Sequence, residues 1–350
     1  MGKFFRFLFN LSDRIKRLLA NLFPSVELKE GREDLFLNKP TDLQIETDIA
    51  DVKVEPSKDE HLQILYQTFD GGPFLKVEQG EGWTKLIFKS RKNKVSLRAF
   101  KANVSLKVLV PDQFLNELSI ATLTGDVYLR HLATKKIDIK SKAGDLFLEN
   151  IKTGEMDLSV HTGDIDLKMV YMNQGNAKLF FGDLKVNEAF GNLKVDSMSG
   201  DLYVYASKFE HLKANSQSGD IQFRICQGSN LSLHSKSGDI FAEDMFYQEH
   251  HIRTVSGDIQ MNRVSGERLD ISTVSGDIAA SMLDGGNIKM RTVSGDASIM
   301  IPSDLIPEEI ITKTVSGDIV RESFSPNSSK MLGRKMDVQT ISGDISVRSI

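Results

Sequence analysis

The stretch Thr254-Val255-Ser256-Gly257-Asp258-Ile259 is the unit from which most of this chain is built. Its Gly-Asp pair occurs twelve times between residues 125 and 344, and nine of the eleven successive spacings are 18 or 19 residues. A period this short predicts stacked repeats and leaves no room for a strand–helix–strand crossover, which needs about 30 residues. We therefore expect an all-β fold, a parallel β-solenoid (β-helix) of about twelve 19-residue coils.

The residues around each Gly-Asp pair repeat as columns that indicate how a coil faces. The residue after the Asp is apolar in every copy, the sixth residue before it is apolar in all copies but Thr312, and Ser or Thr mostly fills the second and fourth positions before it. Because strand side chains alternate with a period of two, this inward set must shift its phase by one residue at Gly-Asp. A corner does this, and glycine tolerates the positive φ of a corner.

The corner residues predicted in this way carry a structural role only. We expect each Asp to accept hydrogen bonds from nearby backbone N–H groups, as in an Asx-turn. Coils stacked in register form parallel strands that rise by ~4.8 Å per coil, and the rule for parallel crossovers favours a right-handed coil. The central corner residues are Gly219, Asp220, Gly238, Asp239, Gly257, Asp258, Gly276, Asp277, Gly295 and Asp296.

Composition and charge exclude several classes of function. The 350 residues carry a net charge of −4, of which residues 1–23 carry +4, so that residues 24–350 carry −8. A rod with that balance lacks the basic stripes that nucleic acid requires. Cys226 is the single cysteine, which excludes an intramolecular disulfide and a cysteine-rich metal site. We therefore expect no nucleic-acid partner.

Residues 3–23 have the pattern of an amphipathic helix that ends at Pro24. Their longest apolar run is three residues, too short for a bilayer span of about 20 residues or for the 7–15-residue apolar run of a signal peptide. A cationic, Phe-rich helix of this kind suits the plane of an anionic membrane surface. A cap on the solenoid, or pairing with another copy, is the alternative. The predicted membrane-binding residues are Lys3, Phe4, Arg6, Phe7, Leu8, Leu11, Arg14, Ile15, Arg17, Leu18 and Leu22.

The remaining chain divides into a polar linker (24–42), an N-terminal β cap (43–115) and the solenoid repeats (116–350). Residues 43–54 resemble a degraded coil without the glycine, and alternating runs at 61–69, 74–78, 83–90 and 104–110 predict further, partly antiparallel strands. These strands should cover the first coil, because the end of a solenoid is an open sheet edge. Insertions at 302–309 and 322–335 should lie over one face or cover the C-terminal edge.

One outward column changes character along the rod. The third residue before the Asp is mixed in the first seven copies and apolar in the last five. An apolar stripe of this kind indicates a protein partner site, cover by the two insertions, or simple β propensity. The possible partner stripe consists of Val255, Val274, Val293, Val315 and Ile341.

Three kinds of chemistry are disfavoured by the spacing of the acidic residues. Calcium-binding β-rolls carry an Asp in every nine-residue turn, whereas here one Asp recurs per coil. Polysaccharide lyases and hydrolases of the parallel β-helix type need two or three clustered acids. The densest titratable group, Glu243-Asp244 with Glu249, His250 and His251, suits an exposed turn as well as a weak metal site. We predict no catalytic residue, metal site or cofactor.

The Thr-Val-Ser-Gly-Asp-Ile copies, with Val108-Leu109-Val110-Pro111 and Leu118-Ser119-Ile120, resemble the bacterial "putative adhesin" Ser-Gly-Asp repeat family. That family includes the Lia-G-like proteins and occurs among cell-envelope stress proteins. The resemblance covers roughly residues 43–350 and implies a β-solenoid without established catalysis and with an envelope-related role.

The function expected from these observations is a non-enzymatic scaffold or sensor, attached peripherally to a membrane by its N-terminal helix. The cytoplasmic face is expected because nothing in the sequence directs export. The alternative is an exported adhesin, or a carbohydrate-active parallel β-helix protein, at the extracellular surface. The oligomeric state stays open.

Overall fold

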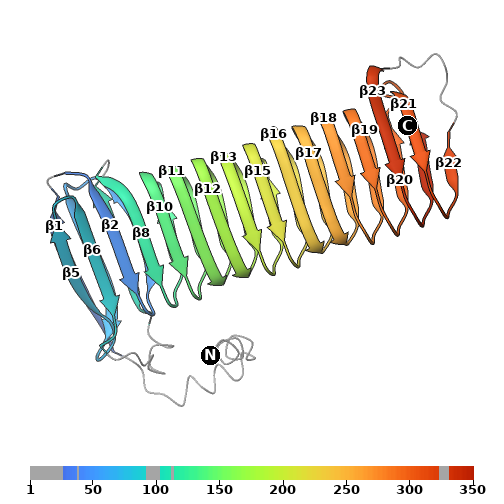
Figure 1. Cartoon of the computed structure of the whole chain (residues 1–350). Helices are drawn as coiled ribbons and strands as arrows, with labels where there is room; N and C mark the ends of the chain where they lie inside the picture. Colours follow the sequence, from blue (N-terminus) through green and yellow to red (C-terminus); the bar gives the residue numbers. More distant parts are fainter. Residues whose placement is uncertain (1–26, 38, 92–102, 112–113, 323–330) are drawn as a thin grey trace.

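The computed structural model describes residues 27–37, 39–91, 103–111, 114–322 and 331–350. These residues form an all-β parallel β-solenoid of about ten turns, drawn out as a rod with the N-terminal strands at one end and the C-terminal strands at the other (Figure 1). They contain no helix, and so none long and apolar enough to cross a membrane. The helix predicted over residues 3–23 lies outside the described residues.

The strands follow one another around and along the rod. In chain order they are β1 Leu28–Phe36, β2 Thr41–Thr47, β3 Asp51–Ser57, β4 His61–Phe69, β5 Phe74–Gly80, β6 Trp83–Lys89, β7 Ser105–Pro111, β8 Leu115–Thr122, β9 Val127–Arg130, β10 Ala133–Ser141, β11 Leu146–Thr162, β12 Ile165–Phe181, β13 Leu184–Ser197, β14 Leu202–Tyr205, β15 Lys208–Ser216, β16 Ile221–Ser237, β17 Ile240–Ser256, β18 Ile259–Ser272, β19 Ile278–Arg291, β20 Ala297–Ile301, β21 Pro307–Lys313, β22 Ile319–Arg321, β23 Met331–Gln339 and β24 Ile345–Ser349.

Each regular coil buries a row of apolar side chains between its outgoing and returning segments. In β17 the inward positions begin with Ile240 and Ala242 after one corner and end with Ile252 and Thr254 before the next. The following coil stacks on it in parallel, with Ile240 opposite Ile259 and Ile252 opposite Ile271. Such ladders place like side chains one above another, so the core is one continuous column along the rod.

The N-terminal end is a partly antiparallel cap, as the alternating pattern predicted. Strands β2 and β3 form the first coil, in which Ala50 stands where later coils have glycine, and β9 stacks directly on β3. Strand β4 runs antiparallel to β1 and β7, and β5 runs antiparallel to β6. The predicted linker differs from the structure, because residues 28–36 form β1. This edge strand is exposed along most of its length, which explains its linker-like polar composition.

The C-terminal coils do not stack in the order of the sequence. Strand β23 lies between β19 and β21, and β24 lies between β20 and β22. The Gly343 corner accordingly rests on Gly295, and Gly317 rests on Gly343. The chain therefore builds its outermost layer with β21 and β22, and then returns to fill the layer beneath. This irregular end, together with the cap, leaves about ten turns instead of the twelve coils expected from the Gly-Asp pairs.

Candidate functional site

The Gly-Asp corners form a ladder of contacts between neighbouring coils. The backbone N–H of Asp258 donates to Oδ1 of Asp239 at 2.8 Å, and Asp258 Oδ1 accepts the N–H of Asp277 at 2.8 Å. Thr254 Oγ1 donates to the carbonyl of Gly238, also in the preceding coil. The Asp acceptors thus join successive coils, whereas the predicted Asx-turn would have placed their bonds within one coil. All the central corner glycines, Gly219, Gly238, Gly257, Gly276 and Gly295, have φ between 118° and 150°.

The second column of hydroxyl residues does not face the core. Ser256, two residues before Asp258, is exposed, although the columns predicted it to point inward with Thr254. The chain has already begun to turn at Ser256, because Gly257 must approach the carbonyl of Gly238. The corner is therefore wider than the alternation indicates, and its outer side is open to solvent.

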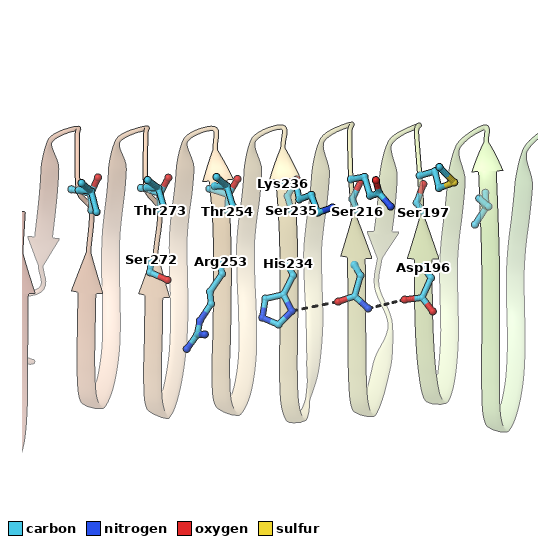
Figure 2. Close-up of a pocket in the computed structure, with 18 of the residues that line it drawn as sticks. Asp196, Ser197, Ser216, His234, Ser235, Lys236, Arg253, Thr254, Ser272 and Thr273 are labelled. Atoms are coloured by element: carbon cyan, nitrogen blue, oxygen red, sulfur yellow. Dashed lines mark hydrogen bonds between the residues drawn. The ribbon is translucent and has the colours of Figure 1, made fainter.

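A groove of about 900 Å³ runs along the rod beside these corners, across seven coils (Figure 2). Each coil contributes three consecutive residues, at the fifth, fourth and third positions before the Asp. The middle residue of each triplet points inward and forms the floor, and Ser197, Ser216, Ser235, Thr254 and Thr273 are buried there. The outer two residues of each triplet form the walls, which lie about 6.7 Å apart because they are alternate residues of one strand.

The two walls have different chemistry. One wall contains the apolar residues of the third position and the other contains mainly polar and basic side chains. The first wall consists of Phe180, Met198, Gln217, Lys236, Val255, Val274 and Val293, and the second of Lys178, Asp196, Asn215, His234, Arg253, Ser272 and Arg291.

The groove continues toward the C-terminal end as a second hollow of about 640 Å³ that shares Val293 and Arg291. Because the last coils are stacked out of sequence order, Ile341 follows Val293 and Val315 comes last. The predicted stripe is therefore continuous in space as Val255, Val274, Val293, Ile341 and Val315. Their exposed fractions are 51%, 47%, 43%, 53% and 82%, so the stripe is open along its whole length.

The groove carries an excess of positive charge on a chain that is acidic overall. Lys178, Lys236, Arg291 and Lys313 line it, and none of them has an ion-pair partner among the described residues. Arg253 lies 3.5 Å from Asp270, which is outside the groove. The lining contains one acidic residue within the part of the chain that the structure describes, Asp196.

The acidic end of the groove is internally paired. Asn215 donates to Asp196 Oδ1 at 2.7 Å, and His234 Nδ1 lies 3.4 Å from the Asn215 carbonyl oxygen (Figure 2). Burial acts to raise the pKa of Asp196, but the bonds from Asn215 and Lys194 outweigh it and lower that pKa. Burial, followed by the nearby Arg253, lowers the pKa of His234. At neutral pH the groove is thus cationic through its lysine and arginine residues alone.

The comparison with protein families covers the whole solenoid. The Toastrack DUF4097 family model matches residues 40–225 and again residues 191–348. This chain belongs to the Toastrack DUF4097 family. No curated protein matches the Toastrack chain.

Solved structures similar to this Toastrack chain have low sequence identity. A "putative cell adhesion protein" from Clostridium sporogenes is 10% identical, with 93% of this chain and 100% of that chain covered and a TM-score of 0.21. A "putative adhesin" from Parabacteroides merdae is 12% identical, with 93% and 96% covered and a TM-score of 0.27. A "putative lipid binding protein" from Parabacteroides distasonis is 15% identical, with 93% and 97% covered and a TM-score of 0.24. The family assignment rests on the family model alone.

The titratable cluster at residues 243–251 is dispersed in the Toastrack structure. Glu243 and Asp244 both pair with Arg263 of the next coil, whereas His250 is buried and donates from Nε2 to the carbonyl of Ser265 at 2.9 Å. Burial lowers the pKa of His250 to about 4. Within the described ranges no group of three or more His, Cys, Asp or Glu side chains could hold a metal ion.

The predicted membrane-binding residues and the polar wall of the groove compare differently with the structure. The predicted membrane-binding residues, all between Lys3 and Leu22, lie outside the described residues. The polar wall of the groove, by contrast, was missed. Its residues recur five positions before each Asp, and that spacing is the one signal by which they could have been found. Their identities vary from Lys178 to Ser272, so no shared chemistry marks the column.

Proposed function

We propose that this Toastrack protein is a non-enzymatic scaffold or sensor that residues 3–23 attach peripherally to an anionic membrane surface. The observation that carries the proposal is the separation of charge along the sequence, with +4 on residues 1–23 and −8 on the remainder. A cationic amphipathic segment binds an anionic surface by its buried apolar area and by attraction of its basic residues, each contributing about 1 kcal/mol. The acidic body is mildly repelled by the same surface, so it should stand off from the membrane.

The side of the membrane follows from the same charges. Basic segments favour the cytoplasmic leaflet, whose surface potential is negative. The link to the cell envelope rests on the resemblance of the Ser-Gly-Asp copies to the Lia-G-like proteins. In this arrangement the solenoid presents its open groove to the solution, where a partner or ligand would bind.

The absence of enzymatic activity is part of the proposal and is supported by the groove. Glycoside-cleaving sites use a pair of carboxyl groups on either side of the scissile bond. In the described lining only Asp196 is acidic, and Asn215 already donates to it. The alternative function is that of an exported adhesin or a carbohydrate-active parallel β-helix protein.

Sedimentation with lipid vesicles tests the membrane attachment. The full-length protein should sediment with anionic vesicles, less with neutral ones, and less again in high salt, because salt screens the basic residues. The double variant Leu11→Glu with Leu18→Glu should stay in the supernatant. A matched control is Ile225→Glu with Met282→Glu, which places two carboxylates at exposed apolar positions of the solenoid. Binding that survives the first double variant contradicts the attachment, and protease accessibility on intact cells decides the side.

A further inference from the structure

We propose that the groove binds one alkyl chain of an anionic amphiphile, with the charged head group at Lys236 and the chain along Val255, Val274, Val293, Ile341 and Val315. This ligand class goes beyond the proposed attachment to a membrane surface and does not depend on residues 3–23. Three features of the groove carry it: the length of the apolar stripe, its width, and the place of the unpaired cations.

The length of the stripe matches an alkyl chain. Its five residues come from five neighbouring coils, and four steps of ~4.8 Å span about 19 Å. One leaflet of a bilayer, half of a hydrocarbon core of ~30 Å, holds an acyl chain in about 15 Å. The stripe therefore offers contact along the whole of a medium or long chain. On the other side of Lys236, Gln217 interrupts the apolar wall, so the chain should extend toward Val315 and not toward Phe180.

The width and repeat of the groove disfavour a peptide. Its walls are about 6.7 Å apart, whereas a helix with side chains is about 10–12 Å across. An extended strand places side chains on one face every ~6.7 Å, out of step with the ~4.8 Å repeat of the stripe. An alkyl chain is narrow and has no side chains to bring into register, so it can contact every residue of the stripe.

Lys236 places an anionic head group at one end of the stripe, because among the described lining residues it is the cation that stands in the valine column itself. Lys236 occupies the same column as the valines and lies one coil before Val255, because its neighbour Ser235 is opposite Thr254. Arg253 stands on the facing wall of the adjacent coil, and Arg291 and Lys313 stand farther along that wall, in the coils of Val293 and Val315. Neither Lys236 nor Arg291 has an ion-pair partner in the described part of the chain. An anion at Lys236 would thus gain a partner without breaking an existing ion pair of this lysine.

The same charges argue against two other occupants. The helix predicted over residues 3–23 would cover the stripe with its apolar face, but the charge of +4 on these residues is repelled by the cations of the groove. A second copy packed groove to groove would bring Lys236, Arg253 and Arg291 toward their own counterparts. Both occupants are outcomes of the test below.

The test is a calorimetric titration of the full-length Leu11→Glu with Leu18→Glu variant, in which the predicted membrane-binding face is disabled. The probes are dodecanoate and dodecyltrimethylammonium, which have the same alkyl chain and opposite charge, each below its micelle-forming concentration. We expect dodecanoate to bind with one molecule per chain and at least ~10-fold more tightly than the cationic probe, a difference of ~1.4 kcal/mol. Because the solenoid is unchanged, this result does not depend on whether the vesicle experiment succeeds.

Two groove variants with matched controls locate the site. Val274→Asp should weaken dodecanoate binding at least ~10-fold by placing a carboxylate in the middle of the stripe. Ile225→Asp, at a position of similar exposure (48% against 47%), should leave it unchanged. Lys236→Glu should weaken dodecanoate binding by a similar factor and narrow its advantage over the cationic probe. Lys208→Glu, at an exposed position outside the groove, should have no effect.

Three results would overturn the proposal. The first is equal binding of both probes, and the second is dodecanoate binding that Val274→Asp leaves intact. The third is the absence of dodecanoate binding to the double variant. A dimer in sedimentation velocity that Val274→Asp dissociates would assign the groove to a second copy. The unmodified full-length protein is titrated beside the double variant, and dodecanoate binding that is present in the variant and missing from the unmodified protein would assign the groove of the unmodified protein to residues 3–23.

Discussion

Nine coils of this solenoid turn at two places where the backbone has positive φ, and the two places are built from different residues. At the Gly-Asp corner, the residues with positive φ are the glycines from Gly125 to Gly343, and their φ angles lie between 114° and 150°. At the second place, called the opposite bend here and lying five residues after the Asp in nine coils, φ lies between 49° and 56° and no residue is glycine. The residues there are His131, Asn150, Met169, Glu188, Ala206, Ile225, Asp244, Arg263 and Met282.

The contact between coils explains the difference. A Cβ at Gly257 would lie 2.2 Å from the carbonyl oxygen of Gly238, and the other corner glycines meet the preceding coil in the same way. At the opposite bend, the side chains of Ile225 and Met282 are 48% and 44% exposed and have room outside the rod. Positive φ alone therefore does not require glycine in this fold. Glycine is required where the backbone of the neighbouring coil comes too close for a Cβ.

The largest expected effect is at the corner. Gly257→Ala should destabilise the solenoid by about 4 kcal/mol, because the added Cβ forces the stacked backbones apart in addition to straining φ. Chemical unfolding followed by circular dichroism measures this loss. Gly71→Ala is the matched control, since Gly71 has a φ of 76° but nothing within 4 Å of the position of its Cβ. That variant should cost only the ~1 kcal/mol of a left-handed residue. Equal losses in the two variants would show that φ, and not contact, selects glycine.

The Gly-Asp corner could be predicted from the sequence, because contact between coils requires glycine there. The opposite bend could not be predicted, because no such contact restricts its residues. The Gly-Asp period, the inward columns and the degraded first coil at residues 43–54 followed from residues that every coil must share. No sequence pattern marks the opposite bend, because its nine residues share a backbone conformation and no side-chain type. The bend also shifts the inward phase within strands such as β12, where the buried residues Leu167 and Val170 are three positions apart, and no residue type marks that shift.

The arrangement of the C-terminal coils and the full groove also lay beyond the sequence. The Gly-Asp pairs at 317–318 and 343–344 carry the same motif, so either could stack on Gly295. Their order depends on which strand packs better between neighbours, which is a long-range choice. The apolar wall of the groove was recognisable because valine repeats. Its partner wall was not, because a solvent-facing column tolerates Lys178, Asp196 or Ser272 equally well.

The second prediction concerns a buried polar group, the imidazole of His250. His250 is fully buried, its Nδ1 has no hydrogen-bond partner, and burial lowers its pKa from 6.5 to about 4. Between these values the unfolded chain binds a proton that the folded one does not, so stability should fall as pH falls from about 6.5 to about 4 and then level off. The contribution of His250 is on the order of 3 kcal/mol.

Comparison with His250→Phe isolates this contribution. The variant keeps a ring beside Tyr247 but removes the titration, so its unfolding free energy should lose less as the pH is lowered. All other titrating groups are common to both proteins and cancel in the difference between them. Parallel pH profiles for the two proteins would mean that the pKa of His250 is not lowered in the folded state, and that water reaches this side chain.

The smallest effect, and the one of opposite sign, is expected at the bend itself. Ile225 has a φ of 56°, which is costly for a β-branched residue, and its exposed side chain contributes little packing. Ile225→Gly relieves that strain of ~1–2 kcal/mol and loses ~0.5–1 kcal/mol through the greater freedom of glycine in the unfolded chain. The unfolding free energy should therefore stay the same or rise by up to about 1.5 kcal/mol, whereas the glycine at the corner cannot be replaced without a large loss. Ile225→Ala separates the two contributions, because it removes the β-branch and keeps the constraint on φ.

If Ile225→Gly were instead destabilising by more than ~1 kcal/mol, the isoleucine would have to make contacts along the edge of the rod. Both turns would then be restricted by contacts, the corner by the backbone of the neighbouring coil and the bend by the side chains around Ile225.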